Sequence, residues 1–335
     1  MSVSVKDVAA LAGVSVGTVS NVLNRPDKVA PTTVERVQSA IAQLGFVRND
    51  AARQLRAGRS RSIGLVVLDV RNPFFTDVAR GAERRAATDG LSILLGNSDD
   101  DPARESDYLD LFEQQRVHGV LITPVDEISG RLERLRTRGI PAVLVDRLSE
   151  GAEFSSVSVD DVSGGYLAVR HLLDIGRRRI AFVGGPEHVR QVADRLEGAR
   201  RAVAEEPDAA LEVVETSALS VLEGRAVGER LRSRGPDGRP DAVFAANDLL
   251  AVGVLQALVM LGSVAVPGDV AIIGYDDIDF SAVTVVPLSS IRQPSELIGR
   301  RAVELLLAEV DGAAEREQVV FQPELIVRDS TRARA

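Results

Sequence analysis

The chain has 335 residues, of which 45% are hydrophobic, and a formal net charge of −9. That length supports two or three domains, each with its own core. The absence of cysteine excludes disulfides and thiolate metal sites. No apolar run has the length of a signal peptide or of an uncharged bilayer-spanning helix, so we expect a cytoplasmic protein with no membrane partner.

Two short amphipathic helices are predicted near the N-terminus. Ser4 can cap a helix from Val5 to Ala12, Gly13 supplies a turn, and Ser15 can cap a second helix from Val16 to Leu23. Two such helices are typical of a helix-turn-helix, whose second helix enters the DNA major groove. Taken alone, this segment fits an ordinary helical hairpin equally well.

Further helical segments follow the pair. A third helix is predicted from Thr32 to Leu44, with Gly45 ending it, and Asn49–Arg56 can form one or two helical turns. Residues 56–61 then form a polar, Gly-containing connector that we interpret as the first domain boundary.

Charge is unevenly distributed along the chain. Residues 1–60 carry eight Lys or Arg and four Asp or Glu, a net charge of +4, so the remaining 275 residues carry −13. A basic head on an acidic body is typical of a phosphate-binding module joined to a ligand-binding module. A charged stretch is more often a solvated face, so the pattern only supports DNA binding.

From residue 61 onward, predicted strands and helices alternate. The strands are Ile63–Leu68, Leu91–Leu95, Val120–Thr123, Ala142–Val145, Ile180–Val183, Glu212–Glu215, Ala242–Ala245 and Val270–Ile273, with a final strand near Gln318–Arg328. The helices are Phe74–Asp89, Ala103–Gln115, Ser129–Arg138, Asp161–Asp174, Arg190–Glu205, Val221–Arg234 and Leu249–Leu261. This alternation in two series predicts two doubly wound parallel sheets, one in each of two lobes.

Polar loops follow the predicted strands, where ligands bind in such folds. These loops are Asp69–Phe75, Asp146–Arg147, Gly184–His188, Ala246–Asp248 and Gly274–Asp277. Carboxylates, guanidinium groups and an amide beside two phenylalanines are suited to a polyol, because the polar groups bind hydroxyls and the rings cover C–H faces. Strand-end loops are polar in any α/β protein, so this pattern alone leaves both interpretations open.

Several motifs resemble the lactose-repressor (LacI) family of transcription regulators. The head contributes VKDVAALAGVSVGTVSNVLN (5–24), LGFVRNDAARQL (44–55) and RSRSIGLVV (59–67); the body contributes VSVDDVSGGYLAVRHLLDIGRRRIAFVGGP, FAANDLLAVGVLQAL and VAIIGYDDIDF. The resemblance implies an all-α helix-turn-helix head and a two-lobed core like that of periplasmic sugar-binding proteins, with an effector in the cleft. The implied domains are 1–47 (DNA-binding), 48–60 (hinge helix and linker) and 61–335 (core, with an N-lobe of about 61–160 plus 292–320 and a C-lobe of about 161–291 plus 321–330).

The resemblance also implies the DNA contacts. Base edges would face Val16, Gly17 and Asn21; phosphates would face Ser15, Thr18, Ser20 and Asn24; the hinge would contribute Ala52, Leu55 and Arg56. Leu55 matches a leucine that wedges between base pairs, which implies a palindromic site and a homodimer. The chain departs from many relatives in having Asn21 where they have Arg or His, and Arg48 where they have Pro.

The implied effector contacts are Phe74, Phe75, Asp146, Arg147, Gln191, Arg195, Leu219, Asn247 and Asp276. Leu219 stands where many relatives have an aromatic residue that stacks on the ligand, which favours a smaller or less flat ligand. We therefore expect a repressor of transcription that binds double-stranded DNA and a small polar effector, most simply a sugar. A corepressor, either nucleobase-like or a phosphoprotein, is the alternative.

Other classes of protein explain the sequence less well. His118, His171 and His188 are far apart and lack the spacing of a metal site, and the nucleophile-elbow and P-loop motifs are absent. We expect no catalytic activity, no metal and no cofactor. A sugar-acting enzyme or a transport binding protein would leave the helical head unexplained.

Overall fold

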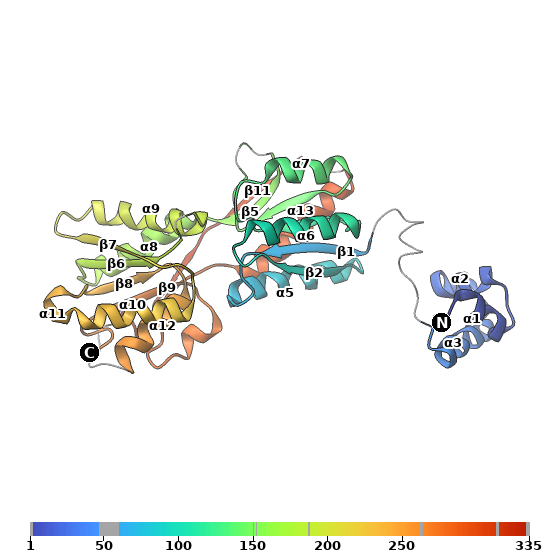
Figure 1. Cartoon of the computed structure of the whole chain (residues 1–335), viewed down its shortest axis with the longest axis horizontal. Coiled ribbons are helices and arrows are strands. Elements are labelled where there is room, and N and C mark those ends of the chain that lie inside the picture. The colour runs from blue at the N-terminus through green and yellow to red at the C-terminus, as the bar shows by residue number, and fades with distance from the viewer. Residues whose placement is uncertain are drawn as a thin grey trace. The chain divides into compact units, whose positions relative to one another are not determined.

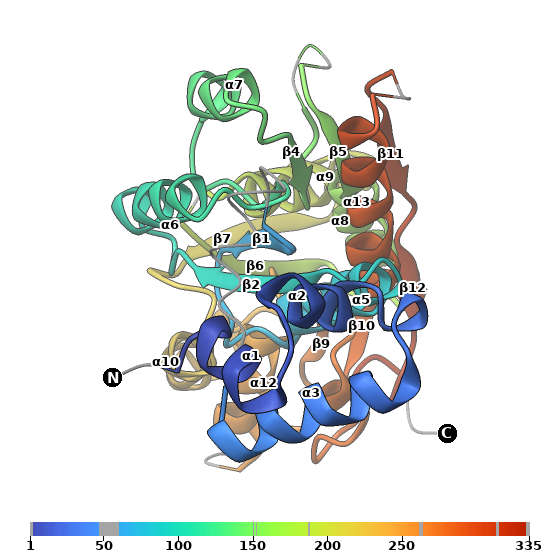
Figure 2. The same ribbon diagram turned by 90° about the vertical axis from the view of Figure 1, so that its right-hand side faces the viewer.

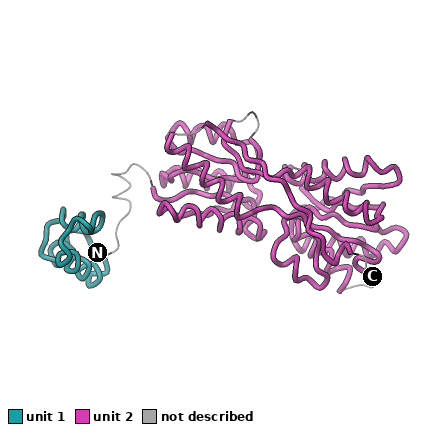
Figure 3. Tube along the Cα trace, turned by 180° about the vertical axis from the view of Figure 1, so that it is seen from behind, with its two compact units in different colours: residues 1–59 teal, residues 60–335 magenta. Residues whose placement is uncertain are grey.

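The computed structural model describes residues 3–46, 60–149, 151, 153–186, 188–260, 264–312 and 315–332. The chain divides into two compact units, residues 1–59 and residues 60–335 (Figure 3). The predicted hinge, with Ala52, Leu55 and Arg56, lies outside the described residues. None of the helices within these ranges is long and apolar enough to cross a membrane.

The first unit is a small helical domain. It contains α1 (Val5–Ala12), α2 (Val16–Asn24), a 3-10 turn η1 (Pro26–Lys28) and α3 (Pro31–Leu44). A capping box between Ser4 and Asp7 starts α1, and Gly13 and Gly45 end α1 and α3 in the left-handed conformation. The three predicted helices are confirmed, and their core is formed by Val8, Ala9, Ala12, Val19, Val22, Val37 and Ala40.

The second unit contains two six-stranded sheets. The first has the order β11-β5-β4-β3-β1-β2 and is parallel throughout. Its strands are β1 (Ser62–Val67), β2 (Ser92–Asn97), β3 (Val120–Ile122), β4 (Ala142–Val145), β5 (Ser155–Val159) and β11 (Gln318–Phe321). Figure 2 shows α6 (Pro102–Gln114) and α7 (Ser129–Thr137) on one side of this sheet and α5 (Pro73–Thr88) and α13 (Ser295–Val310) on the other.

The second sheet has the order β12-β10-β9-β8-β6-β7 (Figure 1). Its strands are β6 (Arg179–Gly184), β7 (Ala210–Glu215), β8 (Ala242–Ala245), β9 (Ala271–Asp276), β10 (Ser289–Arg292) and β12 (Glu324–Ile326). They are parallel except for β12, which is antiparallel to β10. The helices are α8 (Asp161–Asp174), α9 (Arg190–Ala204), α10 (Val221–Ser233), α11 (Gly235–Gly238) and α12 (Asp248–Val259), with a 3-10 turn η3 (Asp279–Ala282).

The predicted two-lobed α/β architecture is confirmed, and its predicted elements lie within a few residues of those observed. The elements that were not predicted are β5, β10, α13, the short helix α11 and the two 3-10 turns. The single final strand predicted near Gln318–Arg328 is wrong, because the chain forms β11 in one sheet and β12 in the other. Pro323 lies between them and has no N–H to continue a strand.

The chain passes between the lobes at three places in the described residues: from β5 to α8, from β10 to α13 and from β11 to β12. These crossings bring the carboxyl ends of strands from both sheets toward each other. The loops that follow these strands therefore come from both lobes and can form a shared site.

Candidate functional site

A cavity of about 370 Å³ lies between the two lobes. Its walls come from the loops after β1, β2, β4, β6, β7 and β8 and from the end of β9. This is the position at which open α/β sheets bind ligands. A volume of this size suits a small organic molecule, since such sites measure roughly 300–1,000 Å³.

All the predicted effector residues except Arg147 line this cavity. They are Phe74, Phe75, Asp146, Gln191, Arg195, Leu219, Asn247 and Asp276. Arg147 lines a second, separate cavity. Among the residues that the structure describes, no group of three or more His, Asp or Glu could hold a metal ion.

Several lining residues were not identified from the sequence. Asn72, Asp99 and Asp100 belong to the cavity wall. Asp101 is the N-cap of α6, and Asp99 and Asp100 precede it in the loop after β2. Asp99 and Asp100 have positive φ angles of 54° and 57°, an uncommon conformation outside glycine that is the one local signal of a special position.

Arg195 is the charged centre of the cavity. It is only 4% exposed, and its Nε donates to Asp161 Oδ1 at 2.7 Å while Nη1 donates to the backbone oxygen of Ala246 at 2.8 Å. The guanidinium carbon also lies 3.7 Å from the centre of the Tyr275 ring. Burial disfavours the charge of Arg195, but the surrounding carboxylates, above all Asp161, outweigh it and raise its pKa. Arg195 therefore stays charged and fixed in the wall.

Asp276 is held in place by two amides. Its Oδ2 accepts from Asn72 Nδ2 at 2.9 Å, and its Oδ1 accepts from Gln293 Nε2 at 2.8 Å. Burial raises the pKa of this carboxyl above its usual value. Asn72 also caps α5, since its Oδ1 accepts from Phe74 N at 3.1 Å. The phenylalanines and Asp276 are therefore positioned by the same side chain.

Asp146 keeps one oxygen available. Gln191 Nε2 donates to the backbone oxygen of Asp146 at 2.7 Å and to Oδ2 at 2.9 Å. Its Oδ1 is buried and has no hydrogen-bond partner among the described residues. Burial raises the pKa of Asp146 well above its usual range, since an uncompensated buried charge is costly. A ligand hydroxyl would provide the missing donor.

Three polar contacts join the lobes across the cavity. Asn72 of the first lobe bonds Asp276 of the second, Asp146 of the first bonds Gln191 of the second, and Asp100 Oδ2 lies 3.1 Å from His188 Nε2. These contacts hold the two walls together in this conformation. They also place the lining groups where a ligand would contact both lobes at once.

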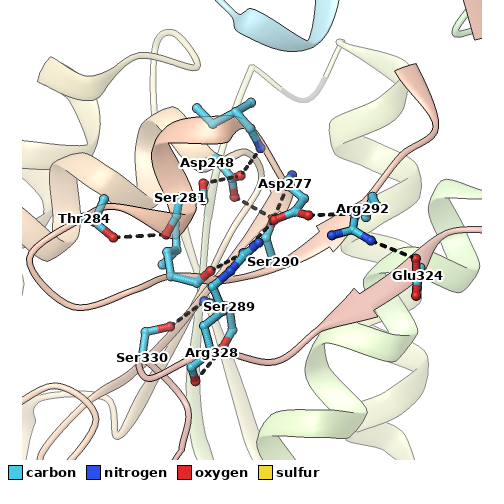
Figure 4. A network of polar contacts seen from close by, with 12 residues as sticks. Asp248, Asp277, Ser281, Thr284, Ser289, Ser290, Arg292, Glu324, Arg328 and Ser330 are labelled. Atoms are coloured by element: carbon cyan, nitrogen blue, oxygen red, sulfur yellow. Dashed lines mark hydrogen bonds and ion pairs between the residues drawn. The ribbon is translucent and has the colours of Figure 1, made fainter. Parts of the chain in front are cut away.

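A separate polar network fixes the loop that follows β9 (Figure 4). Asp248 accepts from Ser281 Oγ at 2.6 Å, from Ser290 Oγ at 2.7 Å and from Ile278 N at 2.9 Å. Asp277 pairs with Arg292 at 2.8 Å and with Arg328 at 2.6 Å. The network ties the segment after Asp276 to β10 and to the end of the chain.

Helix α2 of the first unit presents an exposed polar face. Val16, Gly17 and Asn21 are exposed, whereas Val19 and Val22 are buried in the head. The predicted phosphate contacts bond among themselves. Ser15 Oγ accepts from Thr18 N at 3.0 Å and caps the helix, and Asn24 Nδ2 donates to the backbone oxygen of Ser20 at 2.8 Å. The helix is thus capped and rigid, and its free face can approach a major groove.

Both units match families of known proteins. Residues 4–49 match the model described as "Bacterial regulatory proteins, lacI family", and residues 169–331 match "Periplasmic binding protein-like domain". The chain is 36% identical to the ribose operon repressor of Bacillus subtilis, over 96% of this chain and 95% of the relative. It is 34% identical to the HTH-type transcriptional repressor PurR of Vibrio campbellii, over 98% of each.

Solved structures agree with these matches. The lac repressor dimer bound to operator and the anti-inducer ONPF superimposes with a TM-score of 0.85 and 27% identity, covering 99% of this chain and 100% of the other. The similarity therefore includes the head as well as both lobes.

Proposed function

The chain belongs to the lacI family of bacterial regulatory proteins, and we propose that it is a repressor that binds a palindromic operator as a homodimer and responds to an uncharged sugar. DNA binding follows from the family and from the exposed face of α2. The observation that carries the effector proposal is a cavity walled by both lobes, with a buried carboxylate oxygen that lacks a donor.

The charges around the cavity favour an uncharged ligand. Asp146, Asp161 and Asp276 are 4%, 7% and 6% exposed, and Arg195 is the guanidinium that lies among them. Arg195 is already paired with Asp161 at 2.7 Å, so an anionic ligand such as a sugar phosphate would find no unpaired guanidinium among these three carboxyl groups. Hydroxyl groups, in contrast, can donate to the carboxylates and accept from Arg195.

The apolar part of the wall suits a sugar ring. Phe74 and Phe75 lie edge to face with ring centres 5.0 Å apart, and they can cover C–H groups of a ligand. The same rings could stack on a planar nucleobase, which is the second candidate. The half-buried Leu219 offers no second aromatic surface on its side of the cavity. A sugar is therefore our first candidate for the ligand.

Exposed apolar side chains support a homodimer. Phe280 is 65% exposed, Val283 77% and Val285 65%. They span six positions of the chain at and after η3 and form what we call the apolar cluster of the second lobe. Leu222 of α10 is 76% exposed as well. Exposed apolar surface of this kind is typical of a protein interface.

Lobe closure provides the switch in this proposal. A ligand that contacts both walls binds one arrangement of the lobes better than another, and it shifts the equilibrium by that difference in binding free energy. The contacts Asn72–Asp276, Asp146–Gln191 and Asp100–His188 join the two lobes directly. They stabilise the arrangement in which the cavity walls face each other. Effector and operator affinities are therefore expected to be coupled.

Binding of the full chain to its own upstream DNA tests the proposal. The assay is repeated at several salt concentrations and with neutral sugars, sugar phosphates and nucleobases. We expect salt-sensitive binding to a palindrome that one neutral sugar changes: weakening identifies an inducer, and strengthening identifies a corepressor. Failure to bind any palindrome would contradict the DNA-binding assignment. A response to a sugar phosphate or nucleobase alone would contradict the ligand class.

One variant separates the response to sugar from operator binding. Arg195→Met removes the guanidinium of the cavity wall and leaves the head untouched. We expect it to abolish the response to sugar while operator binding persists. Circular dichroism before the assay establishes that the variant is folded.

A further inference from the structure

A second cavity of about 300 Å³ lies next to the first. It is lined by the loop after β4, the end of β5, the first turns of α8 and α9, and β11. The two cavities share Asp146 and Gln191 and no other lining residue. These two side chains therefore belong to the partition between the cavities and face both of them.

The partition has a fixed part and a removable part. Arg195 in the first cavity and Asp161 in the second are ion-paired at 2.7 Å and almost fully buried, so they form a fixed part. Gln191 closes the rest by donating to Asp146 from the opposite lobe. Its amide is the end of a flexible side chain, and truncating it would leave a gap beside Asp146.

The second cavity also combines apolar and polar surface, although its lining residues include no aromatic ring. Leu148, Val162 and Val320 supply apolar surface, and Ser158 and the Arg190–Asp194 ion pair supply polar groups. Arg147 lines this cavity and makes no hydrogen bond or ion pair with any described residue. Its guanidinium is thus available to hydroxyl oxygens of a ligand. Apolar surface beside unpaired donors suits a second hydroxylated ring.

We propose that Gln191 sets the length of the ligand by separating two sugar-binding subsites. While the Gln191 side chain fills the partition and bonds Asp146, the cleft accepts one ring. When that side chain is truncated, the subsites join and accept two linked rings. Arg147 then belongs to the second subsite. This inference rests on the proposed function, namely that the first cavity binds a neutral sugar.

Calorimetric titration of the full chain tests the inference. The ligands are neutral monosaccharides and the disaccharides that contain them. We expect the unmodified protein to bind a monosaccharide and to bind the matching disaccharides at least about tenfold more weakly. Gln191→Ala should raise disaccharide affinity by about tenfold or more. Gln191→Ser, which also opens the partition, gives a second variant should the first fail to fold.

Two controls distinguish an open partition from a lost hydrogen bond. Gln191→Met keeps the volume of the side chain without its amide, so it should not gain disaccharide binding. Val162 lines the second cavity alone, so Val162→Phe added to Gln191→Ala should cancel the gain and leave the monosaccharide affinity equal to that of Gln191→Ala by itself. Gain with Gln191→Met, or persistence of the gain in the double variant, would overturn the inference.

The remaining outcomes separate the inference from the proposed function. If the unmodified protein binds a monosaccharide and neither opened variant gains a disaccharide, the inference is wrong and the proposed function stands. Equal binding of both ligand lengths by the unmodified protein also overturns the inference. If no neutral sugar binds to any variant, the proposed ligand class is wrong, and the inference is wrong with it.

Discussion

Asn21 is the exposed side chain on α2 that can read a base through paired hydrogen bonds, while Val16 and Gly17 allow only apolar contact and close approach. We expect Asn21→Ala to weaken operator binding by about 1–3 kcal/mol. Binding to a scrambled duplex should be unchanged, because that binding depends on phosphate contacts. Fluorescence anisotropy with both duplexes measures the difference. Gln43→Ala, on the exposed side of α3, is the control that should alter neither affinity.

The buried carboxylates make stability depend on pH. Burial raises the pKa of Asp248 to about 8 and also raises those of Asp146 and Asp276. An unfolded aspartate has a pKa of about 4. Above that pH, the folded protein therefore keeps protons that the unfolded chain has lost. The free energy of unfolding should therefore fall as pH rises from about 6.5 to 8. Burial lowers the pKa of His171, so this group gives the opposite slope near pH 6.5, where an unfolded histidine is about half protonated, and contributes little as the pH approaches 8.

Urea unfolding at fixed pH values measures this dependence. Asp248→Asn removes one of the titrating groups and should make the decline between about pH 6.5 and 8 shallower. The substitution also replaces one acceptor oxygen of Asp248 by an amide that donates, which changes the network of Figure 4, so the comparison concerns the slope with pH and not the absolute midpoint. A midpoint that rises with pH would contradict the prediction.

The helix pairs of the core pack at glycines. Gly81 of α5 lies against the backbone of Glu296 in α13, and Gly299 of α13 lies against the backbone of Val78 in α5. A methyl group at Gly299 would collide with the carbonyl oxygen of Val78, so the helices would have to separate. We expect Gly299→Ala to lower the free energy of unfolding by about 1–3 kcal/mol. Gly130→Ala in α7, where an added Cβ has nothing within 4 Å, should not destabilise the protein. Equal midpoints in urea for the two variants would exclude close packing as the cause.

Local signals made most elements predictable from the sequence. The caps Ser4 and Ser15 and the stop Gly45 define the helices of the head without reference to distant residues. Strands β5 and β10 lack such a signal because they carry buried serines. Their hydroxyls are satisfied by residues far along the chain, as in the bonds Ser155–Glu309 and Ser290–Asp248. Such strands become recognisable only when the sheet is assembled.

The residues of the candidate site also fall into those that the sequence predicts and those that it does not. Residues directly after strands, such as Asp146 and Asn247, were predictable because strand ends meet at one edge of a sheet. Asn72 and Asp100 were not assigned to the site, because their contacts to Asp276 and His188 join residues of different lobes and leave no local signal in the sequence. Arg147 was assigned to the effector site from the family resemblance, but it lines the second cavity, whereas its neighbour Asp146 lines both.

At the scale of the whole molecule, the proposed homodimer should depend on the apolar cluster of the second lobe. Val283 is 77% exposed, so Val283→Asp places a charge in the cluster without disturbing the core. Burial of that carboxylate in an interface costs free energy, whereas burial of the valine side chain does not. Sedimentation at micromolar concentration should therefore show a dimer for the unmodified protein and a monomer for Val283→Asp.

Operator binding should fall together with dimerisation, because a palindrome is contacted by two heads and a single head gives up half of the contacts. Leu111→Asp, at a position 44% exposed on α6 of the other lobe, adds the same charge to a different surface and should leave both properties unchanged. A Val283→Asp variant that stays dimeric would place the interface elsewhere on the molecule. A monomeric variant with full operator affinity would show that one head suffices for binding, and the palindromic operator would then be the wrong expectation.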